Sequence, residues 1–318
     1  MKIGFGLIGL GRHGTRYAES LKEIEGAQLI AVCRRDLSRA EEFASSWGAK
    51  RAYADYGRLI RDREVDAVIV VTPNSTHMEI AIEAAEHRKH VLVEKPIARS
   101  SEEAERMISV ARRNGINLTV GHTFRYHPIT LESVKHLGEI GEVYLTSMCK
   151  RQQRSTGWRL DPEEHGGAIM DIGIHLFDLT RYILRERPTS VQCKAKHVLG
   201  LGVEDSFGAI LELSKERLAI LDASACSNSR TDKMEFVGVE GHLSADRYMR
   251  ELQLVLGDKR QRIPLVGPDA TLHLLLGDFV RSIMEGRESP ISGEDGLEAI
   301  RIAEACHRSS DGNCKVTL

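Results

Sequence analysis

The sequence lacks the features that mark several classes of protein. Its six cysteines are scattered without a C-x-x-C pair, which argues against a disulfide framework and against a structural zinc site. No apolar run approaches the ~18 residues that a membrane helix needs. No basic segment followed by an apolar segment begins the chain, as a secretory signal would. We therefore expect a cytoplasmic protein with reduced thiols, no bound metal and no membrane partner.

The chain also lacks an excess of charge of either sign. Lys plus Arg number 44 and Asp plus Glu number 46, a formal net charge of −2. Nucleic-acid affinity depends on clustered, unneutralised cations, so no nucleic-acid partner is expected. The 318 residues predict two domains, at about 150 residues per domain.

The first third of the chain alternates strand-like apolar runs with segments of helical spacing. This alternation predicts an α/β domain over residues 1–121, a doubly wound parallel sheet of the Rossmann type. The predicted strands are 3–8, 29–33, 67–71, 90–93 and 116–120, and the predicted helices are 15–24, 37–47, 75–87 and 100–113.

The pattern changes near residue 121 and becomes rich in strands. Residues 122–318 are predicted to form an α+β domain with one large, mostly antiparallel, open sheet. The predicted strands are 142–151, 190–198, 207–213, 218–225, 233–239 and 252–256, and the predicted helices are 128–137, 167–183, 271–285 and 294–307.

A glycine-rich segment follows the first predicted strand and precedes a predicted helix. It reads Gly9-Leu10-Gly11-Arg12-His13-Gly14 and matches G-x-G-x-x-G. In a dinucleotide site the first glycine allows the turn, the second admits a pyrophosphate, and the third lets helix pack on strand. The helix N-terminus then presents N–H groups to the anion. We predict that Gly9, Gly11, Arg12, His13 and Gly14 bind a dinucleotide; the alternative is a glycine-rich turn without a ligand.

The end of the second predicted strand bears on the choice of cofactor. About twenty residues after the last glycine, where NAD-binding proteins place an acid on the ribose, the chain has Arg34, then Arg35. A guanidinium suits a 2′-phosphate better than a neutral diol. The sequence therefore favours NADP over NAD. Alternatively, both arginines are a solvated strand end, and Asp36 reaches back to the ribose.

Two further segments carry side chains suited to acid–base chemistry. Glu94-Lys95-Pro96 follows the fourth predicted strand, and the carboxyl ends of such strands line the ligand crevice. A lysine there can stabilise developing negative charge on a substrate oxygen. Asp171 and His175 are four residues apart, so they share one face of a helix, with Asp178 near that face. A carboxylate beside an imidazole orients a general base, although such a pair is often only a surface or core feature.

Candidate substrate contacts are less specific. The run from Lys150 to Arg159 contains Trp158 and several arginines, among them Arg151 and Arg154. Trp158 and Arg159 fit a pocket for a polyol with an anionic group, and a solvated strand edge explains the same residues equally well. Arg125 follows the fifth strand, where it either borders the crevice or serves the domain junction.

Together these segments resemble the Gfo/Idh/MocA oxidoreductase family, which includes glucose–fructose oxidoreductase and inositol dehydrogenase. The resemblance covers essentially the whole chain. Its stretches are the glycine-rich turn, Thr72-Pro73-Asn74 with His77, Glu94-Lys95-Pro96, Gly121-His122 leading to Arg125 and Pro128, and the segment from Gly166 to Asp178.

The resemblance implies an NAD(P)-dependent dehydrogenase acting on a secondary hydroxyl of a sugar, inositol or related polyol. Lys95, Asp171 and His175 fall on the family's catalytic positions, where they would also contact substrate. The residues that fall at the nicotinamide end of the cofactor are Thr72, Pro73, Asn74, His77, Glu94 and Lys95.

The family further implies that the second domain holds the substrate. It also implies a homodimer or homotetramer formed through the open face of that domain's sheet. In the expected mechanism His175 exchanges the hydroxyl proton, Lys95 stabilises the alkoxide and Asp171 orients the site. Two alternatives remain open at this point. One is a redox-assisted glycoside hydrolase or eliminase with tightly bound NAD, and the other is a non-catalytic cofactor-binding sensor.

Overall fold

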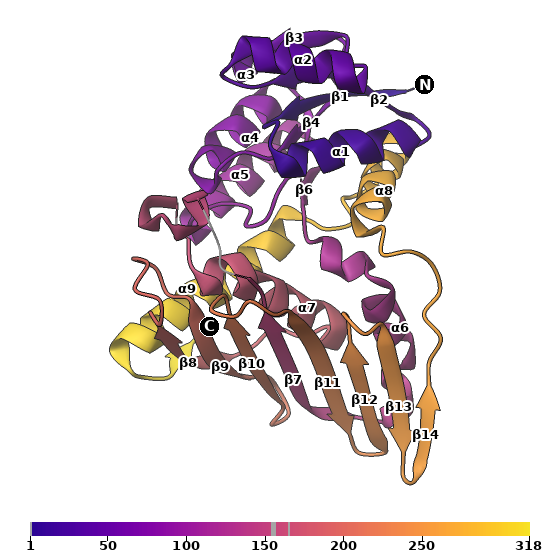
Figure 1. The fold of residues 1–318 in the computed structure, drawn as a ribbon, viewed down its shortest axis with the longest axis vertical. Helices are drawn as coiled ribbons and strands as arrows, with labels where there is room; N and C mark the ends of the chain where they lie inside the picture. The colour runs from indigo at the N-terminus through magenta and orange to yellow at the C-terminus, as the bar shows by residue number, and fades with distance from the viewer. Residues whose placement is uncertain (1, 154–156, 165) are drawn as a thin grey trace. The chain divides into compact units, whose positions relative to one another are not determined.

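A computed structural model describes residues 2–153, 157–164 and 166–318 of the chain. These residues form two compact units, shown as a ribbon in Figure 1. The first unit contains the chain up to Thr123 together with Ala270–Leu297, and the second contains Phe124–Asp269 and Glu298–Leu318.

The first unit is built on a parallel sheet with the strand order β3-β2-β1-β4-β5-β6. This order is typical of Rossmann folds and confirms the predicted fold class. Every residue of β1 and of β4 is buried, as expected for strands covered on both faces. The six strands are β1 Ile3–Ile8, β2 Ala27–Cys33, β3 Arg51–Tyr53, β4 Ala67–Val70, β5 His90–Val93 and β6 Leu118–Val120.

The helices of the first unit have clear sequence signals at their ends. Ser100 caps the helix that follows it by accepting a hydrogen bond from the Glu103 N–H, and Gly115 ends that helix in the left-handed conformation. Within the described part of the chain, no helix has the length and apolarity needed to cross a membrane. The helical segments are α1 Arg12–Glu23, α2 Leu37–Trp47, α3 Tyr56–Ile60, η1 Asn74–Thr76, α4 His77–Glu86, α5 Ser101–Asn114 and α8 Thr271–Glu285.

Helix α8 returns to the first unit from far along the sequence. The Asn117 side-chain amide donates hydrogen bonds to Ser282 Oγ (3.2 Å) and to the Arg287 carbonyl (3.0 Å), and the ring of Phe5 packs against that of Phe279. The predicted division, with all residues after 121 in one domain, did not include this return. Local patterns identify the helix itself, but these long-range contacts decide which sheet it covers.

The second unit contains a sheet with the order β14-β13-β12-β11-β7-β10-β9-β8-β15. Strands β7 and β10 are parallel and all other neighbours are antiparallel, which confirms the predicted large, mostly antiparallel sheet. The strands are β7 Val143–Arg151, β8 Ser190–Lys196, β9 Ser206–Glu212, β10 Leu218–Ser224, β11 Thr231–Gly238, β12 Gly241–Asp246, β13 Glu251–Leu256, β14 Lys259–Arg262 and β15 Val316–Thr317.

Helices α6 and α7 lie over one face of this sheet (Figure 1). The predicted helix over residues 167–183 differs from the structure at its start, because Ile169–Gly173 is a π-helical turn. The helical segments are η2 Thr123–Tyr126, α6 Pro128–His136, η3 Leu137–Ile140, η4 Gly157–Leu160, η5 Pro162–Glu164, the π turn Ile169–Gly173, α7 Ile174–Leu184 and α9 Gly293–Gly312, of which the part from Glu298 onward belongs to the second unit.

Four strands and one short α-helix of the structure were not predicted from the sequence. Strand β14 reads Lys-Arg-Gln-Arg and is fully exposed, so it has no apolar alternation to recognise; a charged edge strand of this kind resists pairing with other chains. Strands β3 and β15 have three and two residues, too few for a periodicity. The others are β12 and α3.

Candidate active site

The three glycines of the glycine-rich segment, Gly9, Gly11 and Gly14, have three different environments. Gly9 has φ +101°, and a Cβ there would lie 2.4 Å from the Val71 carbonyl oxygen. A Cβ on Gly14 would lie 2.2 Å from the Gly9 carbonyl oxygen, so helix and turn pack too closely for a side chain. A Cβ on Gly11 would meet no described atom within 4 Å. Gly11 is the N-cap of α1 and provides no side-chain hydrogen bond to the helix. This turn therefore fits the pyrophosphate of a dinucleotide, with open space at the second glycine.

The residues around the expected ribose position are partly engaged elsewhere. Asp36 caps α2 by accepting a hydrogen bond from the Arg39 N–H (3.2 Å), and its other oxygen lies 3.4 Å from Arg39 Nε. Arg34 is half-buried and its backbone N–H donates to the Tyr53 carbonyl, whereas Arg35 is exposed. Arg12, exposed, and His13, half-buried, begin α1 beside the turn. The carboxylate proposed as an alternative ribose ligand is thus occupied at the start of α2.

His77 connects the turns that follow β4 and β5. Its Nδ1 lies 3.0 Å from the Pro96 carbonyl oxygen, and its Nε2 lies 3.0 Å from the Thr72 carbonyl oxygen. Burial lowers the pKa of His77, which favours the neutral ring with one N–H donor. Asn74 is also buried, and Pro73 directly precedes it in the same turn. The contacts described for His77 give it a positioning role in this half of the site.

Glu94 links helix α1 to the lysine predicted to be catalytic. The Tyr17 hydroxyl donates a 2.8 Å hydrogen bond to Glu94 Oε1, and the Lys95 N–H donates a 3.1 Å hydrogen bond to Glu94 Oε2. Burial and the Glu94 charge raise the pKa of Tyr17 well above its usual value, so the phenol remains a donor. A Cβ on Gly121 would lie 3.3 Å from Glu94. The Lys95–Pro96 peptide bond is cis. Tyr17 was not predicted, because a tyrosine on a helix has no sequence signal for such a contact.

In the second unit, Asp171 lies on the π turn and His175 on the first turn of α7. Gln152 Nε2 donates a 3.3 Å hydrogen bond to Asp171 Oδ2. The imidazole of His175 stacks on the Phe124 ring, with centroids 4.4 Å apart and planes inclined by 27°. Both predicted side chains therefore belong to one helical segment, which a π turn interrupts between them; such turns are frequent at functional sites.

A buried carboxylate holds the start of this π turn. Glu204 Oε1 accepts a 2.9 Å hydrogen bond from the Ile169 N–H, and the Glu204 carbonyl accepts one from the Ala168 N–H. Gly167 has φ +105°, and a Cβ there would lie 2.3 Å from Glu204 Oε2. Burial raises the pKa of Glu204. The glycine is thus required by both conformation and space, and Glu204 helps to position Asp171.

Arg125 and Asp178 form a buried ion pair within the second unit. Arg125 Nε lies 2.9 Å from Asp178 Oδ2, and Arg125 Nη2 lies 2.5 Å from Asp178 Oδ1. Their side chains are 9% and 2% exposed. The guanidinium also lies 4.9 Å from the ring centroid of Tyr182. The structure therefore places Arg125 against α7, where its contacts are those of a positioning residue, and Asp178 is engaged with it.

A second buried charge cluster lies beside Phe124, and the sequence analysis missed it. We call Lys150, Asp232 and Arg247 the buried triad. Lys150 Nζ and Arg247 Nη1 both pair with Asp232 Oδ2, the latter at 2.8 Å. The alternation of β7 and β11 was the available signal, because Lys150 and Asp232 occupy inward positions and face each other across the two strands.

The remaining predicted substrate contacts are only partly described. Arg154 and the side chains of Trp158 and Arg159 lie outside the described residues. Arg151 pairs with Asp222 on the neighbouring strand. The structure thus assigns Arg151 to the sheet, and the predictions for Trp158 and Arg159 stay predictions.

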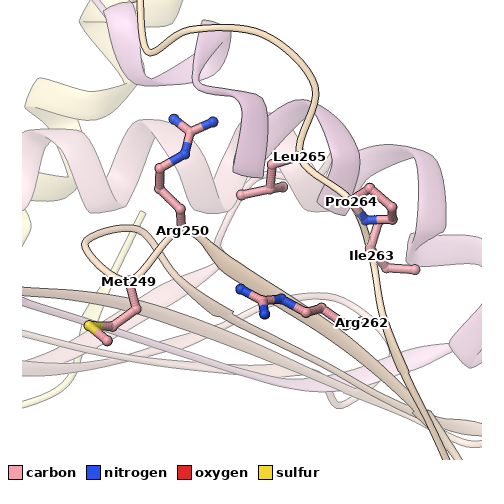
Figure 2. Close-up of a pocket in the computed structure, with 6 residues that line it drawn as sticks. All are labelled: Met249, Arg250, Arg262, Ile263, Pro264 and Leu265. Atoms are coloured by element: carbon pink, nitrogen blue, oxygen red, sulfur yellow. The ribbon is translucent and has the colours of Figure 1, made fainter.

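A surface pocket of about 480 Å³ lies in the second unit (Figure 2). The guanidinium groups that line it belong to Arg250, on a turn before β13, and Arg262, at the end of β14. Arg250 pairs with Asp269, and Arg262 Nη2 lies 3.6 Å from Glu251. Among the residues whose side chains the structure describes, no predicted site residue lines this pocket. Its lining is Met249, Arg250, Arg262, Ile263, Pro264 and Leu265.

Comparison with known proteins identifies the family. Residues 3–122 match the oxidoreductase family with an NAD-binding Rossmann fold, and residues 131–244 match the GFO/IDH/MocA C-terminal domain. The chain belongs to the Gfo/Idh/MocA oxidoreductase family. The resemblance inferred from the motifs is thereby confirmed, as is the Rossmann dinucleotide-binding fold of the first domain.

Gfo/Idh/MocA relatives match over nearly the whole chain. A scyllo-inositol 2-dehydrogenase (NADP(+)), IolU, of Bacillus subtilis is 31% identical, covering 90% of this chain and 89% of the relative. A scyllo-inositol 2-dehydrogenase (NAD(+)) of the same organism is 28% identical, covering 98% and 95%. The crystal structure of aldose-aldose oxidoreductase from Caulobacter crescentus, complexed with glycerol, is 26% identical and covers 100% of both chains with a TM-score of 0.93.

Proposed function

We propose that this chain transfers a hydride between a nicotinamide cofactor and a secondary hydroxyl of an inositol, a sugar or a related polyol. The observation that carries the proposal is the glycine-rich turn, in which Gly11 faces open space while Gly9 and Gly14 do not. The names of the matching relatives, two inositol dehydrogenases and an aldose-aldose oxidoreductase, support the substrate class.

The residues of the first unit fit the cofactor. Gly9, Gly11 and Gly14 would hold the pyrophosphate at the start of α1, with Arg12 and His13 beside it. Thr72, Pro73, Asn74, Glu94 and Lys95 would lie at the nicotinamide end, with His77 fixing their two turns. The nicotinamide, when bound, accepts or donates the hydride, and the protein supplies orientation and electrostatics.

We assign the proton chemistry to three side chains. Lys95 would donate a hydrogen bond to the reacting oxygen and stabilise alkoxide charge. His175 would take the hydroxyl proton in oxidation and return it in reduction, and Asp171 would orient the substrate and the imidazole. This assignment requires that Lys95 and His175 reach the same small molecule. Trp158 and Arg159 remain candidate substrate contacts, and we assign Arg125 to positioning because Asp178 already binds it.

We further infer a preference for NADP over NAD. Arg34 and Arg35 follow β2, where an acid would serve the NAD ribose. Asp36, the nearest acid, is engaged by the Arg39 N–H and guanidinium. The matching relatives include enzymes named for each cofactor, so the preference depends on these residues alone.

We also propose that the chain forms a homodimer or homotetramer through the nine-stranded sheet. Ile210 and Ile220 face each other on β9 and β10 and are 44% and 42% exposed, and Leu218 is 38% exposed. Exposed apolar side chains on adjacent strands favour an interface. Sedimentation of the protein and of an Ile220→Lys variant tests this; a monomeric parent protein contradicts it. The cytoplasmic location stays a prediction.

The activity is tested by measuring net cofactor reduction with a panel of inositols, sugars and sugar acids, using NADP and NAD separately. The proposal expects reduced cofactor to accumulate with a polyol. Release of a leaving group from a glycoside without net reduction would instead favour the redox-assisted hydrolase. Cofactor binding without any turnover across the panel would favour the sensor. Either result would contradict the proposed function.

A further inference from the structure

Phe124 lies between the proposed general base and the buried triad. Its ring stacks on His175, with centroids 4.4 Å apart. Lys150 Nζ lies 4.6 Å from the same ring centroid, and Arg247 Cζ lies 4.2 Å from it. An aromatic face attracts cations at such distances, so the ring is held by both neighbours.

The segment that carries Phe124 contacts one face of helix α7. Phe124 contacts His175, and the adjacent Arg125 contacts Asp178 and Tyr182. The three α7 residues are spaced i, i+3 and i+7, which places them on one side of a helix. These contacts fix the rotation of α7 and therefore the plane of the His175 ring.

The buried triad places a net positive charge beside the Phe124 ring. It has two cations, Lys150 and Arg247, for one carboxylate, Asp232, and their side chains are 8%, 8% and 3% exposed. Buried charges are screened less than surface charges, so the excess acts on neighbouring groups. At the neighbouring His127, burial and then the Arg247 charge lower the pKa to about 4, while Asp269 and Asp232 act in the opposite direction.

We propose that Phe124 and the buried triad form a positioning device for His175, which fixes the imidazole plane and disfavours its protonated form. The proposal rests on the proposed role of His175 as the base. Asp171 on the π turn acts in the opposite sense, because a carboxylate favours imidazolium. The Arg125–Asp178 pair on the other side of the helix is internally neutral. The positive charge of the triad thus opposes the effect of Asp171 on the His175 pKa, and the neutral imidazole can accept a proton.

Lys150→Met tests the electrostatic part. It keeps the length of the side chain and leaves the Arg247–Asp232 ion pair, so the triad becomes neutral. We expect the pKa of His175 to rise by about one unit. Lys233→Met is the matched control: it removes the same charge one residue from Asp232, but that lysine is 59% exposed and pairs with Asp246. The control should leave His175 unchanged.

The pKa is measured by NMR titration of ring-labelled histidines. The protein has 13 histidines, so the His175 signal is assigned by its loss in His175→Asn. The acidic limb of the pH profile of kcat/KM is measured in parallel. An unchanged His175 pKa in Lys150→Met overturns the proposal whatever the activity. If the His175 pKa moves but the kinetic limb does not, the electrostatic device stands and the role of His175 as the base is contradicted.

Phe124→Leu tests the positioning part, with Phe124→Tyr as the conservative variant. The leucine variant should lower kcat by about tenfold with little change in KM, and the tyrosine variant should restore it. Equal kcat values for the leucine variant and the parent overturn the positioning role. If Phe124→Leu fails to fold, the Lys150→Met titration still decides the proposal.

Discussion

The Tyr17 hydroxyl donates a 2.8 Å hydrogen bond to Glu94 Oε1, joining the helix after the glycine-rich turn to the residue before Lys95. The second Glu94 oxygen accepts the Lys95 N–H. One carboxylate therefore connects the proposed cofactor turn with the proposed catalytic lysine, through two elements that are distant in the sequence. Because the pKa of Tyr17 is raised, this hydrogen bond persists across the working pH range.

Tyr17→Phe removes this hydrogen bond and leaves the ring. We expect the free energy of unfolding to fall by about 1–3 kcal/mol, since a charged acceptor loses a buried partner. We also expect kcat to fall, because Lys95 is less well fixed. Urea unfolding and steady-state kinetics measure the two effects. Tyr144→Phe, at a residue 48% exposed on β7, is the control. Equal stability of the two variants would contradict the role of Tyr17.

Gly11→Ala and Gly14→Ala separate cofactor binding from packing. The added Cβ at Gly11 meets no described atom, so the stability should change little while cofactor affinity falls by about tenfold or more. The Cβ at Gly14 would overlap the Gly9 carbonyl, so the stability should fall by about 1–3 kcal/mol. Thermal unfolding with and without cofactor distinguishes them. A Gly11→Ala variant with normal cofactor affinity would contradict the proposed pyrophosphate position.

The sequence predicted the parts of the molecule that follow local rules. The buried strands β1, β4 and β5, the helix after Ser100 and the mostly antiparallel second sheet all have clear periodicity or capping signals. The sequence also placed a lysine after β5 and put Asp171 and His175 on one helical segment, while their catalytic roles stay predictions. In each case the information lies within a few residues of the chain.

Contacts between distant segments were not predictable in the same way. Helix α8 has a clear helical pattern, but its place beside Phe5 depends on packing. The π turn depends on Glu204, more than thirty residues away from Ile169. The buried triad was also missed, although the sequence does contain a signal for it. Lys150 and Asp232 are charged residues at inward-facing positions, and they interrupt the apolar alternation of two strands.

Arg34→Ser tests the cofactor preference. Loss of a charged hydrogen bond to the 2′-phosphate should weaken NADP binding by about tenfold to a hundredfold and leave NAD binding nearly unchanged. Arg39→Ser is the control, since it removes a nearby positive charge that already pairs with Asp36. Calorimetric titration with each cofactor gives the ratio. An unchanged ratio in Arg34→Ser would refute the preference.

His127 should make the stability pH-dependent. Its pKa is about 4 in the folded protein, through burial and the Arg247 charge, against about 6.5 in an unfolded chain. As the pH falls, the unfolded state therefore takes up this proton at a higher pH than the folded state does. The stabilisation is fully present above about pH 6.5 and is lost as the pH falls towards about 4, about 3 kcal/mol in total.

His127→Asn isolates this contribution. Asparagine keeps an acceptor for the Ile129 N–H, which His127 Nδ1 accepts at 3.2 Å, and cannot take up the proton. Urea unfolding between pH 4 and 7 should show a shallower loss of stability in the variant than in the parent. His87→Asn, at an exposed position, is the comparison. Parallel curves for the parent and His127→Asn would show that His127 does not contribute.

Hydride transfer from a deuterated substrate tests the central claim most directly. The polyol that reduces the cofactor is supplied with deuterium at its CH–OH carbons, and the reduced cofactor is analysed by mass spectrometry and NMR. We predict deuterium at C4 of the nicotinamide, and a loss of transfer of about 10²-fold or more in Lys95→Met and His175→Asn, with cofactor affinity retained. Reduced cofactor without deuterium, or normal transfer in Lys95→Met, would contradict the account.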